Sequence, residues 1–254
     1  AQIPTMVYFH ENQFAYPLQR PEQQRELMHF RLSNLYTAIC GDSLIFNSEY
    51  NRQTFLLGLR KFLKSMPDFA PRAIVSELES KSQVLSVPLE LDLFSRKKEN
   101  KLSSKELFFV WNHRWEYDKG PNVLFKALEL CKLNGLPFKI ALLGQQFSSS
   151  PDAFQKIQSA FAENIIQFGY LPSKEEYLDM VQSCDIVLST AIHEFQGLAI
   201  LESMALGLTP IAPNRLSYPE FIPEEYLYQS HLDDPDKEAF ALYQLLEKFY
   251  HSKD

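Results

Sequence analysis

The sequence predicts an α/β protein in which two units follow one another along the chain, each a parallel sheet covered by helices. Two observations lead to this fold class. Short runs rich in β-branched and aromatic residues alternate with longer amphipathic runs, which is the pattern of consecutive βαβ units. A polar, charged stretch then interrupts the alternation, and the pattern starts again after it. The length of 254 residues and the hydrophobic content of 45% suit two domains with packed cores.

The first series of elements occupies residues 1–95. Asn47 and Ser48 stand where a helix N-cap is expected, and Pro88 is expected to stop the last strand. Because the first strand resembles an inner strand of a sheet, we expect a Rossmann-like domain that lacks its first strands. The predicted elements are a strand at 5–9, a helix at 23–40, a strand at 42–48, a helix at 49–63 and a strand at 82–91.

Residues 96–106 are predicted to be a linker, because they are polar and charged with few apolar side chains. The second series, residues 107–254, has the elements of a nearly complete doubly wound domain. It contains no internal repeat or low-complexity segment. The predicted strands are 107–113, 138–144, 165–171, 185–190 and 208–213, and the predicted helices are 121–134, 152–162, 174–183, 197–206 and 235–250.

The net charge of −7 is shared unevenly. Residues 105–254 hold 12 Lys and Arg against 21 Asp and Glu, whereas residues 1–72 hold 8 against 6. The chain therefore lacks the bulk basic footprint of many nucleic-acid-binding proteins. If RNA binds, we expect it to bind the N-terminal part.

The three cysteines are far apart and form no CxxC motif. This argues against a disulfide framework or a zinc knuckle and favours a reducing compartment, the cytoplasm or a eukaryotic nucleus. The longest apolar runs are too short to cross a membrane, so no membrane partner is expected. The sequence does not indicate an oligomeric state.

A ligand site is expected where the strand at 185–190 ends, because ligands of open α/β sheets bind beyond the carboxyl ends of the strands. Gly197, at the start of the next helix, lets a ligand approach the backbone N–H groups, which favour a phosphate. Glu194 is placed to accept hydrogen bonds from sugar hydroxyls, and Glu202 to meet a ribose diol. The alternative, that Glu202 is an ordinary surface residue, is disfavoured by its apolar neighbours.

A second set of candidates follows the first strand of the second series. Arg114 and Lys119 bracket a turn that ends at Gly120, so both can point into the same site. A diphosphate leaving group needs positive charge, which Arg supplies as a bidentate fork and Lys as a point charge. The alternative is that Arg114 pairs with Glu116 or Asp118 on the surface.

These residues resemble a family. Arg114 and Lys119, followed by Glu194 and Glu202, are similar to the motifs of retaining, nucleotide-sugar-dependent glycosyltransferases of the GT-B type, family 4, in which two Rossmann-like domains face a cleft. The resemblance implies that the Arg/Lys pair holds the diphosphate, that Glu202 holds the ribose and that Glu194 holds the transferred sugar. It also implies that no metal and no other cofactor is required. The backbone amides implied for sugar binding are near Glu194, at Phe195, Gly197 and Leu198.

A narrower resemblance runs through more of the chain. It concerns family 4 enzymes that transfer mannose from GDP-mannose to the queuosine of a tRNA anticodon. The resemblance implies GDP-mannose as donor, tRNA as acceptor and retention of configuration. The similar segments are YFHENQFAYP, IFNSEYN, NHRWEYDKGP, GYLPSKEEY, HEFQGLAILE and YPEFIPEEYLY.

The HENQ segment also supplies a second catalytic candidate besides Glu194. In family 4 enzymes a His at the position of His10 often contacts the donor sugar near the reacting carbon, so His10 is expected to orient or polarise the sugar rather than act as a nucleophile. The alternative is a histidine that only satisfies local hydrogen bonds. Asn12 and Gln13, next to it, are expected on the acceptor side.

Further acceptor contacts are expected from a basic stretch with interleaved aromatic residues, for which the alternative is a solvated helix end. Two other functions stay open: a family 4 enzyme with another sugar nucleotide and acceptor, and a non-catalytic sugar-nucleotide or RNA-binding module. The candidate RNA-binding cations are Arg60, Lys61, Lys64 and Arg72.

Overall fold

The computed structural model describes residues 3–17, 23–66, 70–96, 105–146 and 150–252. The chain divides into two compact units. The N-terminal unit comprises Ala1–Pro88 and His193–Gln196, and the C-terminal unit comprises Leu89–Ile192 and Gly197–Asp254. The predicted linker at 96–106 lies mostly outside the described residues.

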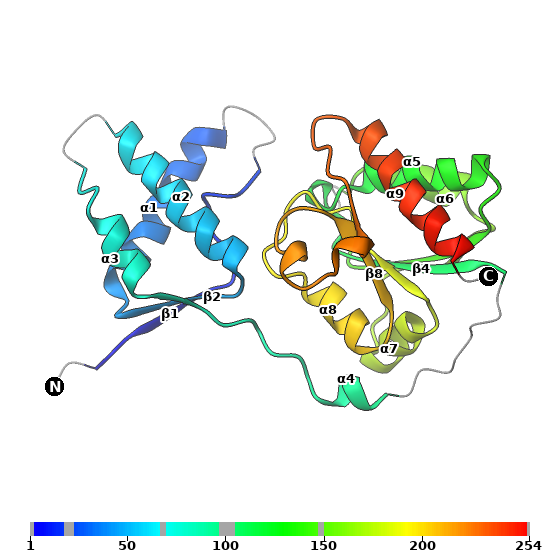
Figure 1. The fold of residues 1–254 in the computed structure, drawn as a ribbon, viewed down its shortest axis with the longest axis horizontal. Helices are drawn as coiled ribbons and strands as arrows, with labels where there is room; N and C mark the ends of the chain where they lie inside the picture. Colours follow the sequence, from blue (N-terminus) through cyan, green and yellow to red (C-terminus); the bar gives the residue numbers. More distant parts are fainter. Residues whose placement is uncertain (1–2, 18–22, 67–69, 97–104, 147–149, 253–254) are drawn as a thin grey trace. The chain divides into compact units, whose positions relative to one another are not determined.

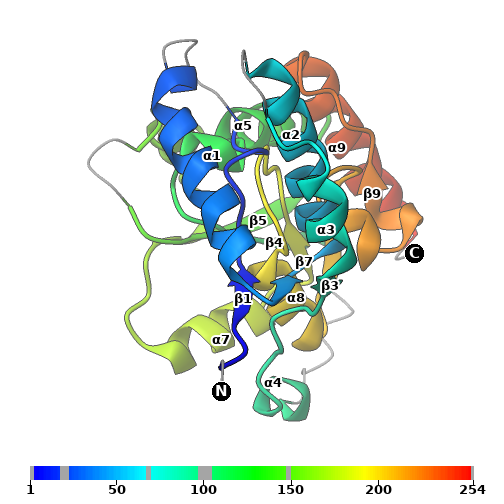
Figure 2. The ribbon, with the colours of Figure 1, turned by 90° about the vertical axis from the view of Figure 1, so that its left-hand side faces the viewer.

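The N-terminal unit is a three-stranded parallel sheet with helices packed on it, as predicted. Ser48 caps the second helix, since its Oγ accepts a hydrogen bond from the Asn51 N–H at 3.0 Å. Figure 2 shows α1 to one side and α2 with α3 to the other. In order, the elements are β1 (Met6–Phe9), α1 (Gln23–Cys40), β2 (Ser43–Phe46), α2 (Glu49–Ser65), α3 (Ile74–Ser80) and β3 (Ser82–Val84), with sheet order β1-β2-β3.

The last strand of this unit is shorter than the predicted 82–91. The Leu85 N–H still donates to the Phe46 carbonyl, but Val87 has left the sheet and its N–H and C=O both pair with the side-chain amide of Gln196, each at 3.0 Å. A side chain distant in sequence has thus replaced the strand partner. The helix α3 was not predicted.

The C-terminal unit holds a six-stranded, all-parallel sheet in the order β6-β5-β4-β7-β8-β9. Each long element of the second predicted series is present, with ends shifted by a few residues. The elements are α4 (Asp92–Ser95), β4 (Leu107–Asn112), α5 (Pro121–Leu133), β5 (Phe138–Leu143), α6 (Ala153–Ala160), β6 (Ile165–Gly169), α7 (Lys174–Gln182), β7 (Ile186–Leu188), α8 (Leu198–Ala205), β8 (Thr209–Pro213), β9 (Leu227–Tyr228) and α9 (Pro235–His251).

Alternate residues of the strands build two separate cores, one on each face of this sheet. Phe109 and Trp111 of β4 pack with α5, α6 and α9, whereas Val110 packs with α7 and α8. This follows from the two-residue period of a strand, which sends successive side chains to opposite faces. Figure 1 shows α5, α6 and α9 on one side of the sheet and α7 and α8 on the other. The predicted doubly wound arrangement is confirmed.

Candidate functional site

Several candidate residues of the C-terminal unit lie at one edge of its sheet. Strands β4, β5, β6 and β7 run parallel and end at Asn112, Leu143, Gly169 and Leu188. Their carboxyl ends therefore share an edge, where the following loops carry functional groups. The cationic candidates follow β4, and Glu202 is on the helix that follows β7.

The loop after β4 carries both cations in different surroundings. The Arg114 side chain is 60% exposed, and its Nη2 lies 3.3 Å from Glu116 Oε2, the surface pairing that the sequence left open as an alternative. The Lys119 side chain is only 8% exposed, and its Nζ lies 3.3 Å from Asp118 Oδ2. Arg114 is thus accessible, whereas Lys119 is held within the loop.

Backbone contacts fix this loop against the segment that follows β7. The Ile192 N–H donates to the Asp118 carbonyl at 2.7 Å, and the Thr190 hydroxyl donates to the Lys119 carbonyl at 2.7 Å. Gly120 completes the turn with φ 65°, and a Cβ there would lie 2.1 Å from the Thr190 carbonyl oxygen. Only glycine fits this approach without strain, so the sequence of the turn positions Lys119.

The helix α8 begins after Gly197, whose φ of 77° lies in the left-handed region. Leu198 is exposed at its first turn, and Glu202 is half-buried further along. Burial and the nearby Glu90 carboxylate raise the pKa of Glu202, while Lys174 acts in the opposite direction. Lys174 itself forms an ion pair with Glu90.

The segment His193–Gln196 groups with the N-terminal unit. Glu194 is half-buried, and its Oε1 accepts a hydrogen bond from the Phe195 N–H at 3.0 Å. Phe195 is buried, with its ring 4.7 Å from that of His193 and 6.0 Å from that of Tyr50. The ring of His193 also lies 5.2 Å from that of Tyr16, just beyond the HENQ segment.

His10 and its neighbours follow β1 in the same unit. His10 is exposed, its ring lies 4.7 Å from that of Tyr8, and its carbonyl accepts a hydrogen bond from Asn47 Nδ2 at 2.8 Å. Gln13 is half-buried, and its N–H donates to Asn34 Oδ1 at 2.8 Å. The His10 side chain is therefore available to a ligand.

Asn12 differs from its predicted place on the acceptor side. It is fully buried, and its Nδ2 donates to the Asn51 carbonyl and Oδ1 and to Thr54 Oγ1. Its Oδ1 accepts from the N–H groups of Phe14 and Ala15. Both polar atoms hold the loop in shape, because a buried amide must be satisfied internally. Asn12 positions this loop and does not face an acceptor.

Three of the four candidate RNA-binding cations line one cavity of about 210 Å³ in the N-terminal unit. Arg60 and Lys64 come from α2 and Arg72 from the segment before α3, with Leu63 and Val75 between them. Arg60 Nη2 lies 3.7 Å from Glu79 Oε2. Lys61 is exposed but does not line the cavity.

The sequence interpretation missed a cavity of about 380 Å³ at the carboxyl edge of the C-terminal sheet. Asn112 and Tyr177 lie in segments that carry the family resemblance, but the sequence predicts no role for either. In the structure Asn112 Nδ2 donates to the Tyr177 hydroxyl at 2.9 Å. Burial raises the pKa of Tyr177 to about 12. The cavity is lined by Asn112, His113, Arg114, Leu143, Gly144, Gln145, Tyr170, Leu171, Pro172, Lys174 and Tyr177.

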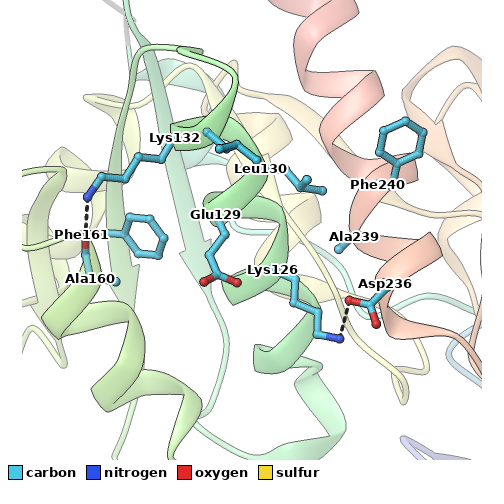
Figure 3. Close-up of a pocket in the computed structure, with 10 residues that line it drawn as sticks. Lys126, Glu129, Leu130, Lys132, Ala160, Phe161, Asp236, Ala239 and Phe240 are labelled. Carbon is cyan, nitrogen blue, oxygen red and sulfur yellow. Dashed lines mark hydrogen bonds and ion pairs between the residues drawn. The ribbon is translucent and has the colours of Figure 1, made fainter.

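A larger groove of about 760 Å³ lies among α5, α6 and α9, on the helices that cover one face of the sheet (Figure 3). Both of its lysines have partners within the groove: Lys126 Nζ lies 2.6 Å from Asp236 Oδ1, and Lys132 Nζ donates to the Ala160 carbonyl at 2.9 Å. None of the residues that line it is a predicted site residue.

Three further findings concern the described residues only. They contain no group of three or more His, Cys, Asp or Glu that could hold a metal ion. None of their helices is long and apolar enough to cross a membrane. Cys40, Cys131 and Cys184 are free cysteines, of which Cys40 is exposed and the other two are buried.

Two family models match the chain. Residues 94–252 match the model of the glycosyl transferases group 1, and residues 1–89 match the N-terminal model of tRNA-queuosine alpha-mannosyltransferase. A Drosophila melanogaster tRNA-queuosine alpha-mannosyltransferase is 38% identical over 234 residues, which are 89% of this chain and 61% of that protein. The chain thus spans about three fifths of the length of this relative.

Solved structures share the fold at low sequence identity. Anabaena HepE in complex with UDP has a TM-score of 0.66 at 15% identity, covering 97% of this chain and 63% of that one. A mutant of Staphylococcus aureus TarM, in a complex that includes UDP, has 0.65 at 15%, covering 98% and 46%. Sucrose-phosphate synthase from Thermosynechococcus elongatus has 0.64 at 16%, covering 96% and 63%.

The two parallel sheets have the arrangement of the GT-B fold, and the solved structures share it. The matched range, residues 94–252, makes up more than half of the chain and includes all strands of the larger sheet. The chain belongs to the glycosyl transferases group 1 family.

Proposed function

We propose that this protein transfers mannose from GDP-mannose to queuosine in the anticodon of tRNA, with retention of configuration. The match of residues 1–89 to the N-terminal model of tRNA-queuosine alpha-mannosyltransferase carries the proposal, and it is supported by a Drosophila enzyme of that name that is 38% identical over 234 residues. The match of residues 94–252 alone supports only glycosyl transfer.

The cations after β4 would hold the donor diphosphate. The diphosphate gains negative charge as the bond to the sugar breaks, so cations aimed at it stabilise the transition state more than the ground state. The exposed guanidinium of Arg114 can leave Glu116 and form a bidentate pair with a phosphate. Lys119 is held in the loop by its backbone and supplies a fixed positive charge.

The two glutamates would bind the two sugars of the donor, the ribose and the mannose. Glu202, half-buried on α8, would accept hydrogen bonds from the ribose. Glu194 would accept from hydroxyls of the mannose, and the backbone N–H groups of Gly197 and Leu198 would donate to that sugar. The Phe195 N–H already donates to Glu194 Oε1 at 3.0 Å, so it would donate to the sugar only after leaving that carboxylate. An ionised carboxylate is a strong acceptor with two oxygens, which suits a vicinal diol.

In the proposed reaction the bond between the anomeric carbon and the diphosphate oxygen breaks. The acceptor hydroxyl oxygen of queuosine forms the new bond on the same face of the sugar, and its proton passes to the leaving phosphate oxygen. His10 orients or polarises the reacting sugar rather than acting as a nucleophile. The resemblance to family 4 implies that the protein side chains carry this step without a metal or another cofactor.

The tRNA is proposed to bind through the N-terminal unit. Arg60, Lys64 and Arg72 line one cavity there, which concentrates positive charge where an RNA phosphate can reach it. Contacts of this kind release counterions, so binding should weaken steeply with salt. The triple variant R60A/K64A/R72A should reduce both the affinity for tRNA and its salt dependence, as measured by filter binding at several salt concentrations.

The donor is tested by calorimetric titration with GDP, UDP and ADP. The proposal expects GDP to bind best, with Arg114→Ala weakening it by about 1.5–3 kcal/mol, the scale of a charge-assisted hydrogen bond. Glu202→Gln should weaken GDP and GDP-mannose alike, whereas Glu194→Gln should weaken GDP-mannose more than GDP. A preference for UDP would identify another sugar nucleotide, and equal losses in both Glu variants would contradict the division of roles.

The acceptor is tested by incubating the full gene product with radiolabelled GDP-mannose and tRNA that contains or lacks queuosine. Label should enter only the queuosine-containing tRNA. Equal label in both tRNAs, or in neither, would remove queuosine as the acceptor and leave the family assignment intact.

A further inference from the structure

Asn112, the last residue of β4, is held in a single amide orientation. Its side chain is buried, with the residue only 6% exposed. Nδ2 donates to the Tyr177 hydroxyl at 2.9 Å, to Ser203 Oγ at 3.2 Å and to the Ala199 carbonyl at 3.3 Å. A carbonyl oxygen accepts only, so exchanging Oδ1 and Nδ2 would bring two acceptors together. The hydrogen-bond network therefore assigns the orientation of the amide.

The oxygen of this amide, Oδ1, is buried without a hydrogen-bond donor among the described residues. Buried acceptors without a donor are rare and costly, and each one calls for a ligand, an ion or a water. Asn112 also lines the cavity of about 380 Å³ at the carboxyl edge of the sheet. That cavity is large enough to admit a ligand group.

The surroundings indicate which group would supply the missing donor. Tyr177, which bonds to Nδ2, is close enough to Glu202 for that carboxylate to help raise its pKa. The Asn112 amide also contacts α8 directly, through the Ala199 carbonyl at 3.3 Å and Ser203 Oγ at 3.2 Å. Glu202 immediately precedes Ser203 on that helix, although it does not itself line the cavity. The Asn112 amide and the Glu202 carboxylate both offer acceptor oxygens, which suits a group with two adjacent hydroxyl donors.

We propose that Asn112 is a further binding residue for the donor nucleotide, whose Oδ1 accepts a hydrogen bond from one ribose hydroxyl while Glu202 accepts from the other. This inference rests on the proposed function as far as the ligand is a sugar nucleotide. It does not depend on the base or the sugar, because the ribose diol is common to GDP, UDP and ADP. Because Oδ1 is buried and can only accept a hydrogen bond, it should favour a ribonucleotide over the corresponding deoxynucleotide. The deoxynucleotide lacks the hydroxyl and would leave Oδ1 unpaired.

The test compares GDP, 2′-deoxy-GDP, 3′-deoxy-GDP and IDP by calorimetric titration of the wild type and two variants. Asn112→Ala removes the acceptor. Ser203→Ala is the structural control. It removes one hydrogen-bond partner of Asn112 Nδ2, and Ser203 is buried and does not line the cavity. Tryptophan fluorescence in urea checks that both variants fold.

We expect Asn112→Ala to weaken GDP and IDP about 10-fold, the effect of a buried acceptor bond, and to change the affinity for one of the deoxy nucleotides less than about 2-fold. Ser203→Ala should change the affinity for all four ligands by a common factor. If Asn112→Ala also acts by one common factor on all four, the residue is structural and the inference is overturned. If its effect disappears only for IDP, the contact is to the base, which also overturns it.

The same comparison separates this inference from the donor assignment. If the wild type prefers UDP, GDP-mannose is wrong as donor, and UDP with its deoxy analogues then decides the role of Asn112. Failure of every nucleoside diphosphate to bind would overturn both.

Discussion

A buried ion pair should hold the end of β7 in place, and removing one partner should destabilise the C-terminal unit. Arg215, after β8, and Glu238, in the first turn of α9, are 8% and 2% exposed and lie 2.7 Å apart. The guanidinium also donates to the Ala191 carbonyl at 2.9 Å, and the carboxylate accepts from the His231 N–H at 2.8 Å. The pair thus connects α9 to Ala191, in the segment after β7 that leads to Glu194.

We expect Glu238→Leu to cost about 3–5 kcal/mol, because it leaves a buried guanidinium without its partner. With a urea m-value of about 2 kcal/mol/M, the midpoint should fall by about 1.5–2.5 M. The double variant R215M/E238L should lose less than the sum of the single changes, since no buried charge is then left alone.

The assay is urea unfolding followed by tryptophan fluorescence. The chain has 2 tryptophans, and both Trp111 and Trp115 are buried in the C-terminal unit, so the signal reports that unit alone. Lys126→Ala is the control, because it removes a more exposed ion pair with Asp236, worth about 1 kcal/mol or less. A Glu238→Leu midpoint no lower than that of the control would refute the reasoning, as would full additivity in the double variant.

Three other predictions concern the site. Lys119→Ala should weaken GDP binding by about 1.5–3 kcal/mol in calorimetry. Lys126→Ala, which removes a lysine outside the site, should leave GDP binding unchanged. The raised pKa of Glu202 means that, as the pH falls, its carboxylate is lost at a higher pH than that of an ordinary glutamate, and GDP affinity should fall with it. Glu90→Gln should shift that loss to lower pH in the same titration, and an unmoved pH profile would contradict the assignment. By linkage, protonated Glu202 adds stability below the unfolded pKa that disappears as the pH rises through the folded value. Gly120→Ala should lower the urea midpoint more than Gly135→Ala, because both have positive φ but a Cβ at Gly135 meets nothing within 4 Å.

The order and type of most elements could be predicted because their signals are local. The spacing of apolar residues located α1 to its observed bounds, and Ser48 marked the start of α2 through a cap made within one turn. The same approach overextended β3, because the partner of Val87 is Gln196, 109 positions away. Short elements such as β9 were missed, since two residues carry no periodicity.

The general location of the donor site followed from sequence in the same way. Once consecutive strands are parallel, the residues after them must share an edge, which placed Arg114, Lys119 and Glu202 on that side of the sheet. Local sequence also identified Gly120 as the end of the turn.

What each polar side chain does there was decided by the tertiary structure. Asn12, two residues after His10, points inward, and both its amide atoms form hydrogen bonds within the protein. Asn112 instead lines a cavity, and its amide oxygen has no donor among the described residues. The physical reason is that a buried amide is defined by its partners, and these come from distant parts of the chain: Ser203 is 91 positions from Asn112. Periodicity and spacing describe which residues share a face, but only the packed structure decides which of their atoms are left for a ligand.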